Sequence, residues 1–126
     1  MSSTSQIQSH RDLKIWIKGI QLVKEIYKMC ESLPKEEIYA LQSQLKRSAV
    51  SIPSNIAEGY GRNYTKSYIQ FLNIARGSLL ELETQVTIAY ELEFIESNQY
   101  ERILVVIEEE NKMINAFIKS VERHLN

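Results

Sequence analysis

Apolar residues recur at every third or fourth position through most of the chain, a spacing that places side chains along one face of an α-helix. It runs through four segments, at about 12–32, from about 35 to Gly59 or Gly61, from 65 to about 92–94, and at about 98–124. The β-branched residues keep the helical spacing and do not alternate, so no strand is expected. Four long helices with short connections predict an all-α fold, an antiparallel up-down four-helix bundle.

Signals at the helix ends support these boundaries. Asp12 is placed for the cap or first turn of the first helix, and Pro34 ends that helix because a proline disfavours helical geometry in the residue before it. Thr65 and Ser97 are the expected N-caps of the third and fourth helices. The segment Gly59–Tyr64 is expected to be a loop, in which a glycine can take the left-handed conformation that closes a helix.

Pro53 falls inside the second helical pattern. It lacks an N–H, and its ring would collide with the carbonyl of Ala49 in a regular helix. The apolar period nevertheless continues on both sides, at Ile52 and Ile56. The pattern therefore predicts one helix that is kinked at Pro53.

One apolar stripe on each helix is predicted to face the core. On the first two helices it comprises Leu13, Trp16, Ile20, Val23, Tyr27 and Cys30, then Ile38, Leu41, Leu45, Ala49, Ile52 and Ile56. On the last two it comprises Tyr68, Leu72, Ala75, Leu79, Leu82, Val86 and Ala89, then Tyr100, Ile103, Ile107, Ile114, Phe117, Val121 and Leu125.

A second apolar set widens three of these stripes. It comprises Ile15, Leu22, Ile26, Phe71, Ile74, Val105, Val106 and Met113. Either these residues flank the core of a single bundle, or they form the interface of a homo-oligomer. We predict that they form the interface, because one bundle of this length is not expected to bury both sets.

Composition is typical of one ordinary domain: 126 residues, 44% hydrophobic, with 4 Gly and 2 Pro. Residues 1–11 are polar and are expected to be a disordered N-terminal segment, and 12–126 to form the bundle domain. Neither a signal sequence nor a membrane span is expected, since the start is Ser-rich and the longest apolar run is Ile103–Ile107. The single cysteine, Cys30, cannot form an intrachain disulfide, which favours a cytoplasmic location.

Basic residues are unevenly distributed. The net charge is −1, but residues 1–62 hold nine Lys or Arg against six Asp or Glu, and the rest hold six against ten. Any contact with a polyanion is therefore expected to use the first half of the chain. The candidate nucleic-acid-binding residues are Lys46, Arg47, Arg62, Lys66 and Arg76, with Tyr60 and Tyr64 for base stacking. The alternative interpretation is an ordinary solvated helix surface.

Residues for catalysis are not apparent. The only histidines, His10 and His124, lie at the two ends, so neither a di-metal carboxylate site nor a general base is indicated. Cys30 lies at a core spacing and is predicted to be a structural thiol. No glycine-rich phosphate loop is present. We predict no catalytic residue, no metal and no cofactor.

Two groups of polar residues lie beside the apolar stripes of the middle helices. They are Ser51, Asn55 and Glu58 on the second helix and Ser78, Glu81 and Gln85 on the third. Because buried polar groups must find partners, we predict a structural polar network between these helices rather than a ligand site.

The segment Lys46–Arg62, KRSAVSIPSNIAEGYGR, resembles the 23S rRNA intervening-sequence protein family of bacteria. The segments Leu13–Trp16, Leu41–Leu45 and Phe71–Gln85 are also similar to the family pattern. The resemblance implies an up-down four-helix bundle that assembles into a ring, typically a pentamer, with no known enzymatic activity. A similar fold occurs in the accessory protein of diversity-generating retroelements, which binds nucleic acid and a reverse transcriptase and is markedly basic, whereas this chain is not.

Two functional hypotheses follow. The first is a non-enzymatic homo-oligomer that contacts RNA or DNA phosphates through the basic residues above, with weak contacts reinforced by repetition around the ring. The second is a protein-interaction scaffold or adaptor that uses apolar outer helix faces and touches no nucleic acid. The expected partners are copies of the chain itself, RNA or DNA, or another protein, and not a membrane.

Overall fold

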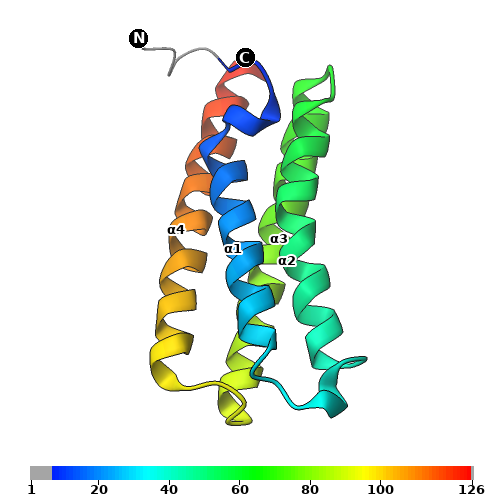
Figure 1. Cartoon of the computed structure of the whole chain (residues 1–126). Helices are drawn as coiled ribbons and strands as arrows, with labels where there is room; N and C mark the ends of the chain where they lie inside the picture. The colour runs from blue at the N-terminus through cyan, green and yellow to red at the C-terminus, as the bar shows by residue number, and fades with distance from the viewer. Residues whose placement is uncertain (1–6, 126) are drawn as a thin grey trace.

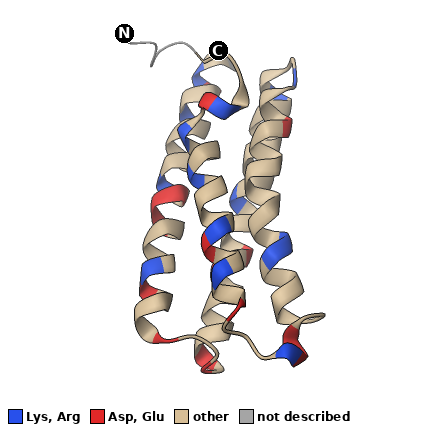
Figure 2. Cartoon of the chain, in the orientation of Figure 1, with Lys and Arg blue, Asp and Glu red and all other residues tan. Residues whose placement is uncertain are grey.

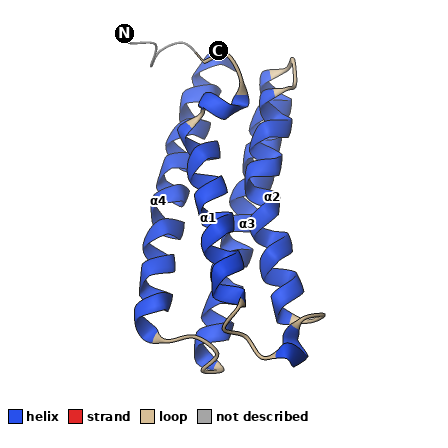
Figure 3. Ribbon diagram, in the orientation of Figure 1, coloured by secondary structure: helices blue, strands red, loops and turns tan. Residues whose placement is uncertain are grey.

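A computed structural model describes residues 7–125 of the chain. Its long helices are α1 (Lys14–Cys30), α2 (Leu41–Tyr60), α3 (Thr65–Glu91) and α4 (Ser97–Glu122). Single 3-10 turns precede α1 and α2 and follow α4, at His10–Asp12, Lys35–Glu37 and Arg123–Leu125, and this part of the chain contains no strand (Figure 3). The helices lie side by side, and successive helices are joined at alternate ends of the molecule (Figure 1). The predicted all-α four-helix bundle is confirmed.

The core stripe of α3 is where the pattern predicts it. From Leu72 to Ala89, all six predicted residues are fully buried, and Tyr68 is half-buried. On α2, five of the six predicted residues are buried. The exception is Ile38, which is 44% exposed because it precedes the helix, directly after the 3-10 turn. The side chain of Leu125 lies outside the described residues.

The predicted inward face of α1 is only partly right. Leu13 and Cys30 are buried and Trp16 and Val23 are half-buried, but Ile20 and Tyr27 are exposed, whereas Leu22 and Ile26, expected on the outside, are fully buried. The apolar residues of this helix form one broad face, so the helical period alone does not specify which part of that face points to the core. Packing makes the choice: buried Gly19 brings α1 close to α2, because a methyl group there would lie 3.4 Å from Pro53 Cβ.

Half of the predicted oligomer interface is consequently inside a single chain. Four of the eight residues are buried and cannot line an external surface. Two others are half-buried, and two are exposed. The buried four are Ile15, Leu22, Ile26 and Val106, the half-buried two are Phe71 and Met113, and the exposed two are Ile74 and Val105. The prediction is wrong for the first four, because a single bundle buries the second apolar set of α1 and Val106 of α4 in its own core.

The helix ends differ in detail from the expectations. Asp12 caps the 3-10 turn and not α1, since its Oδ2 accepts hydrogen bonds from the N–H groups of Gln8 and Ser9 at 2.9 and 3.2 Å. Thr65 and Ser97 are the first helical residues and not caps. The predicted disordered segment 1–11 lies mostly outside the described residues, and its last two residues belong to this 3-10 turn.

The turn after α2 does not use a left-handed glycine. Gly61 has a φ of −77°, in the right-handed region. Within residues 7–125 a positive φ occurs only at Glu93, at 64°, where the Phe94 N–H donates to the Ala89 carbonyl at 2.9 Å and closes α3. The left-handed conformation that closes a helix therefore occurs after α3, at Glu93, and not at a glycine after α2.

Pro53 is buried within α2, and the helix is continuous from Leu41 to Tyr60. The proline has no N–H, so the carbonyl of Ala49 lacks its usual helical donor. The kink at Pro53 stays a prediction.

Candidate functional site

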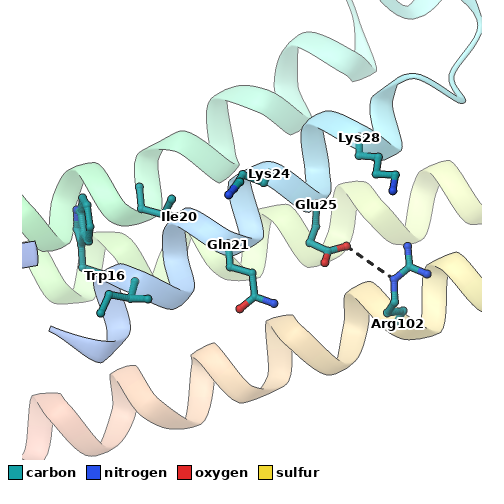
Figure 4. A pocket seen from close by; sticks show the side chains of 8 residues that line it. Trp16, Ile20, Gln21, Lys24, Glu25, Lys28 and Arg102 are labelled. Atoms are coloured by element: carbon teal, nitrogen blue, oxygen red, sulfur yellow. Dashed lines mark ion pairs between the residues drawn. The ribbon is translucent and has the colours of Figure 1, made fainter. Parts of the chain in front are cut away.

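An open groove of about 640 Å³, called here the α1–α4 groove, runs along the outer surface of α1 and reaches α4 at Arg102 (Figure 4). Trp16 lies at one end, and Lys28 lies with Arg102 at the other. Seven of the lining residues come from α1, and Arg102 comes from α4. The lining comprises Trp16, Ile17, Ile20, Gln21, Lys24, Glu25, Lys28 and Arg102.

The groove carries more positive than negative charge. Its three cations face one carboxylate, Glu25, whose Oε1 lies 3.8 Å from Arg102 Nε in a loose, solvent-exposed ion pair. Lys24 and Lys28 are exposed, and Lys or Arg recurs along the rest of α1 (Figure 2). Exposed ion pairs of this kind add little to stability, so these cations remain available to an external anion.

The other end of the groove is aromatic and apolar. Trp16 is half-buried, and its ring meets His10 edge-on with centroids 5.2 Å apart. Ile17 is 53% exposed beside it. A flexible chain that carries both charge and flat rings would find complementary chemistry along the groove.

The structure does not gather the five predicted nucleic-acid-binding cations into one patch. Lys46 lies 4.8 Å from the ring centroid of Tyr27, toward α1, whereas Arg76 donates to Asn115 Oδ1 at 2.8 Å, toward α4. Arg47 lies between α2 and α3. These three side chains face three different neighbours.

The remaining predicted residues lie near the connection between α2 and α3. Arg62 pairs with Glu58 at 2.7 Å and covers the ring of Phe71 at 4.8 Å. Lys66 and Tyr64 are exposed, and Tyr60 is half-buried with its ring edge-on to Tyr68. This end of the bundle thus keeps two cations, of which one already has a carboxylate partner.

The predicted polar network is partly assembled at the α2–α3 interface. Ser51 Oγ and Ser78 Oγ are 2.8 Å apart, and Asn55 Nδ2 donates to Ser51 O and Oγ at 2.8 and 2.9 Å. Glu58 does not join them, because it pairs with Arg62. Ser51 and Ser78 also line a polar cleft of about 450 Å³ together with Gln44, Arg47, Ser48, Glu81 and Gln85.

Three buried groups have strongly shifted proton affinities. Burial raises the pKa of the Glu110 carboxyl to about 8, against the smaller opposing effect of Lys18. Burial likewise raises the pKa of Cys30 to about 11 and that of Tyr68 to about 12. The Cys30 thiol is therefore protonated at neutral pH and buried, as expected of a structural thiol.

Neither a metal cluster nor a membrane span is found in the described range. Residues 7–125 contain no group of three His, Cys, Asp or Glu side chains arranged to hold a metal ion. No helix in that range has the length and apolar character needed to cross a membrane.

Sequence reasoning missed the cations of the α1–α4 groove and the buried Glu110. A signal for Glu110 exists, because it falls on the inward stripe of α4 between Ile107 and Ile114. Lys24, Lys28 and Arg102 have no local signal, since Arg102 lies more than seventy residues further along the chain and joins the lysines only through helix packing.

Comparison with known proteins identifies the family. One solved structure similar to this chain is that of a protein of unknown function from the S23 ribosomal protein family of Bacteroides thetaiotaomicron. The two chains are 28% identical, with a TM-score of 0.77 over 83% of this chain and 95% of the other. No curated protein matches the chain. The family described as 23S rRNA-intervening sequence protein matches residues 11–116, which cover four-fifths of the sequence and all but the end of the bundle, and the chain belongs to that family.

Proposed function

We propose that the protein is a non-enzymatic homo-oligomeric bundle that binds the phosphate backbone of RNA or DNA along the α1–α4 groove. The observation that carries the proposal is the set of three exposed cations, Lys24, Lys28 and Arg102, which share one groove with a single carboxylate. This replaces the five cations that the sequence suggested, because those face separate grooves.

Charge and shape both support a flexible, single-stranded ligand. Each neutralised phosphate releases counterions, so three cations on a single strand predict that affinity falls about 20-fold between 50 and 200 mM salt. Trp16 adds an aromatic surface at the end of the groove. One subunit has a net charge of only −1, so useful affinity depends on repetition of the groove in an assembly.

The test measures fluorescence anisotropy of a labelled single-stranded RNA of about 20 nucleotides, long enough to follow the groove and its repeats. The double variant Lys24→Glu/Lys28→Glu is compared with Arg62→Glu/Lys66→Glu, which makes the same change in charge at the end of the bundle. We expect the first to lose binding at least tenfold and to flatten the salt dependence, and the second to bind within about threefold of the wild type.

Two results would overturn the proposal that RNA or DNA binds along the α1–α4 groove. One is an unmodified protein that shows no salt-sensitive binding at 50 mM salt. The other is a greater loss in the Arg62/Lys66 variant than in the Lys24/Lys28 variant, which would restore the connection between α2 and α3 as the binding surface.

Self-association is supported by the outer face of α3. Ile74, Leu80 and Ile88 are 44%, 54% and 42% exposed there, in a single chain whose core is otherwise complete. Gly77 lies on the same exposed face, with no atom within 4 Å of where its Cβ would be, so a second helix can approach closely.

Light scattering tests this second part of the proposal. A ring of five copies, as the family resemblance implies, would have a mass of about 74 kDa, against 14.7 kDa for one chain. We expect Leu80→Glu to shift the assembly toward the monomer, and Glu101→Lys, an exposed change on α4, to leave it intact. A monomeric wild type would overturn the assembly and, together with absent RNA binding, would favour the protein-interaction scaffold.

A further inference from the structure

The polar cleft between α2 and α3 is chemically different from the α1–α4 groove. Arg47 on α2 and Glu81 on α3 are both exposed in its lining. Neither takes part in an ion pair within the described part of the chain. In a single chain the cleft therefore presents one positive and one negative group to the solvent, contributed by two different helices, with Glu81 on the same side of α3 as Ile74 and Ile88.

Between these charges the lining is made of hydroxyl and amide groups with spare hydrogen-bonding capacity. Gln85 is only 7% exposed, and its Oε1 is buried without a hydrogen-bond partner. The Ser51–Ser78 pair uses one hydroxyl hydrogen, so one O–H is left to donate elsewhere. An unpaired buried amide oxygen is costly, and a ligand that donates to it removes that cost.

The lining excludes several classes of ligand. It contains no aromatic ring on which a nucleobase would stack, and a single carboxylate in a lining that also holds a guanidinium disfavours a divalent cation. Glu81 would repel a polyanion. The serine and glutamine side chains leave little apolar surface for a hydrophobic ligand. What remains complementary is a small molecule that carries both an ammonium and a carboxylate.

We propose that this cleft binds a small zwitterion of the amino-acid or dipeptide type. The ligand carboxylate would pair with the Arg47 guanidinium, which suits it as a planar, bidentate donor. The ligand ammonium would pair with Glu81, and rotation of the Gln85 side-chain amide would turn its Oε1, buried in the free chain, toward the same ammonium. The volume of about 450 Å³ is in the range of small-molecule sites.

The test is calorimetric titration of the full chain with three probes: glycine, L-glutamine and glycylglycine. Acetate and ethylamine serve as half-probes, each with only one of the two charges. We expect at least one zwitterion to bind at least tenfold more tightly than either half-probe. Arg47→Ala and Glu81→Gln, both exposed substitutions, should each weaken that binding at least tenfold, whereas Lys66→Ala, an exposed change on α3, should not.

The outcomes separate this site from the proposed RNA function. Arg47→Ala should leave RNA binding along the α1–α4 groove within about threefold, because Arg47 is not part of that groove. Absence of binding by all three zwitterions at 10 mM would overturn the proposal, as would binding that survives both cleft substitutions. A cleft variant that loses RNA affinity while zwitterion binding is absent would assign Arg47 to the polyanion surface and also overturn it.

Discussion

The α2–α3 and α1–α4 helix pairs differ in how closely their helices pack. α2 and α3 form the most extensive contact of the bundle, and Gly59 lets them touch so closely that a methyl group there would lie 2.9 Å from Phe71 Cβ. α1 and α4 make a smaller contact and leave a groove edged by long charged side chains. Small residues at the first interface allow polar groups to pair, whereas the second leaves its cations in solvent.

The contact between α1 and α4 also holds the buried carboxyl of Glu110. It projects from α4 toward Gly19 of α1, where an added methyl group would lie 3.3 Å from its Oε2, and both of its oxygens lack hydrogen-bond partners. At the α2–α3 interface, by contrast, the hydroxyls of Ser51 and Ser78 are bonded to each other. Both Glu110 oxygens are therefore unpartnered between α4 and α1, whereas the α2–α3 interface combines the bonded serine pair with one unpartnered oxygen, Gln85 Oε1.

The largest expected effect is the pH dependence that Glu110 confers. Its pKa is about 8 in the folded chain and about 4.3 when unfolded, so the folded state binds the extra proton between those values. The stability that it contributes is fully present below about pH 4.3 and is lost as the pH rises to about 8, by roughly 3–5 kcal/mol in total. Glu110→Gln should remove this decline and raise the free energy of unfolding at pH 8, measured by urea titration from pH 5 to 9.

Glu109→Gln is the matched control. Glu109 is largely exposed and pairs with Lys18 at 2.6 Å, so its loss should change stability by less than about 1 kcal/mol. A wild-type stability that is unchanged between pH 5 and 8 would contradict the assignment of Glu110 as a buried neutral acid.

The next effect tests the close approach of α2 and α3. Gly59→Ala places a methyl group against Phe71 and the Tyr68 backbone, 3.2 Å from the carbonyl oxygen, so the helices must separate. We expect a loss of about 1–3 kcal/mol in the free energy of unfolding. Gly77→Ala should have the opposite sign and stabilise the single chain by about 0.5–1 kcal/mol, because that exposed position has open space around it. Equal effects at the two glycines, in thermal or urea unfolding, would contradict the difference in packing.

The smallest effect concerns the Ser51–Ser78 hydroxyl pair. Ser51→Ala or Ser78→Ala alone should cost about 1 kcal/mol, because each removes the 2.8 Å hydrogen bond between a half-buried and a buried hydroxyl. The double variant should cost less than the sum of the two, by about 0.5–1 kcal/mol, in a double-mutant cycle. Strict additivity would show that the 2.8 Å contact contributes nothing to stability.

Particular residues show where prediction from sequence succeeded and failed. The stripe from Leu72 to Ala89 was predicted correctly because its apolar residues recur every three or four positions without interruption, and all six are fully buried. The stripe of α1 was predicted only in part, because its apolar residues form one broad face, and packing around Gly19 buries the side with Leu22 and leaves Ile20 at the exposed edge. The candidate binding residues do not form one patch for a related reason: Lys46 and Arg76 are close to others in sequence but point to different neighbours in space.

The sequence by itself determined the number of helices, their approximate limits, the core faces of α2 and α3, and the family. These properties depend on local periodicity, turn residues and a long motif, all of which are written along the chain. Only the tertiary structure decided the rotation of α1, the isolation of the Glu110 carboxyl, and which cations share a groove. Those features depend on how each helix turns about its axis when it packs, and helix rotation is set by neighbours that lie far away in the sequence.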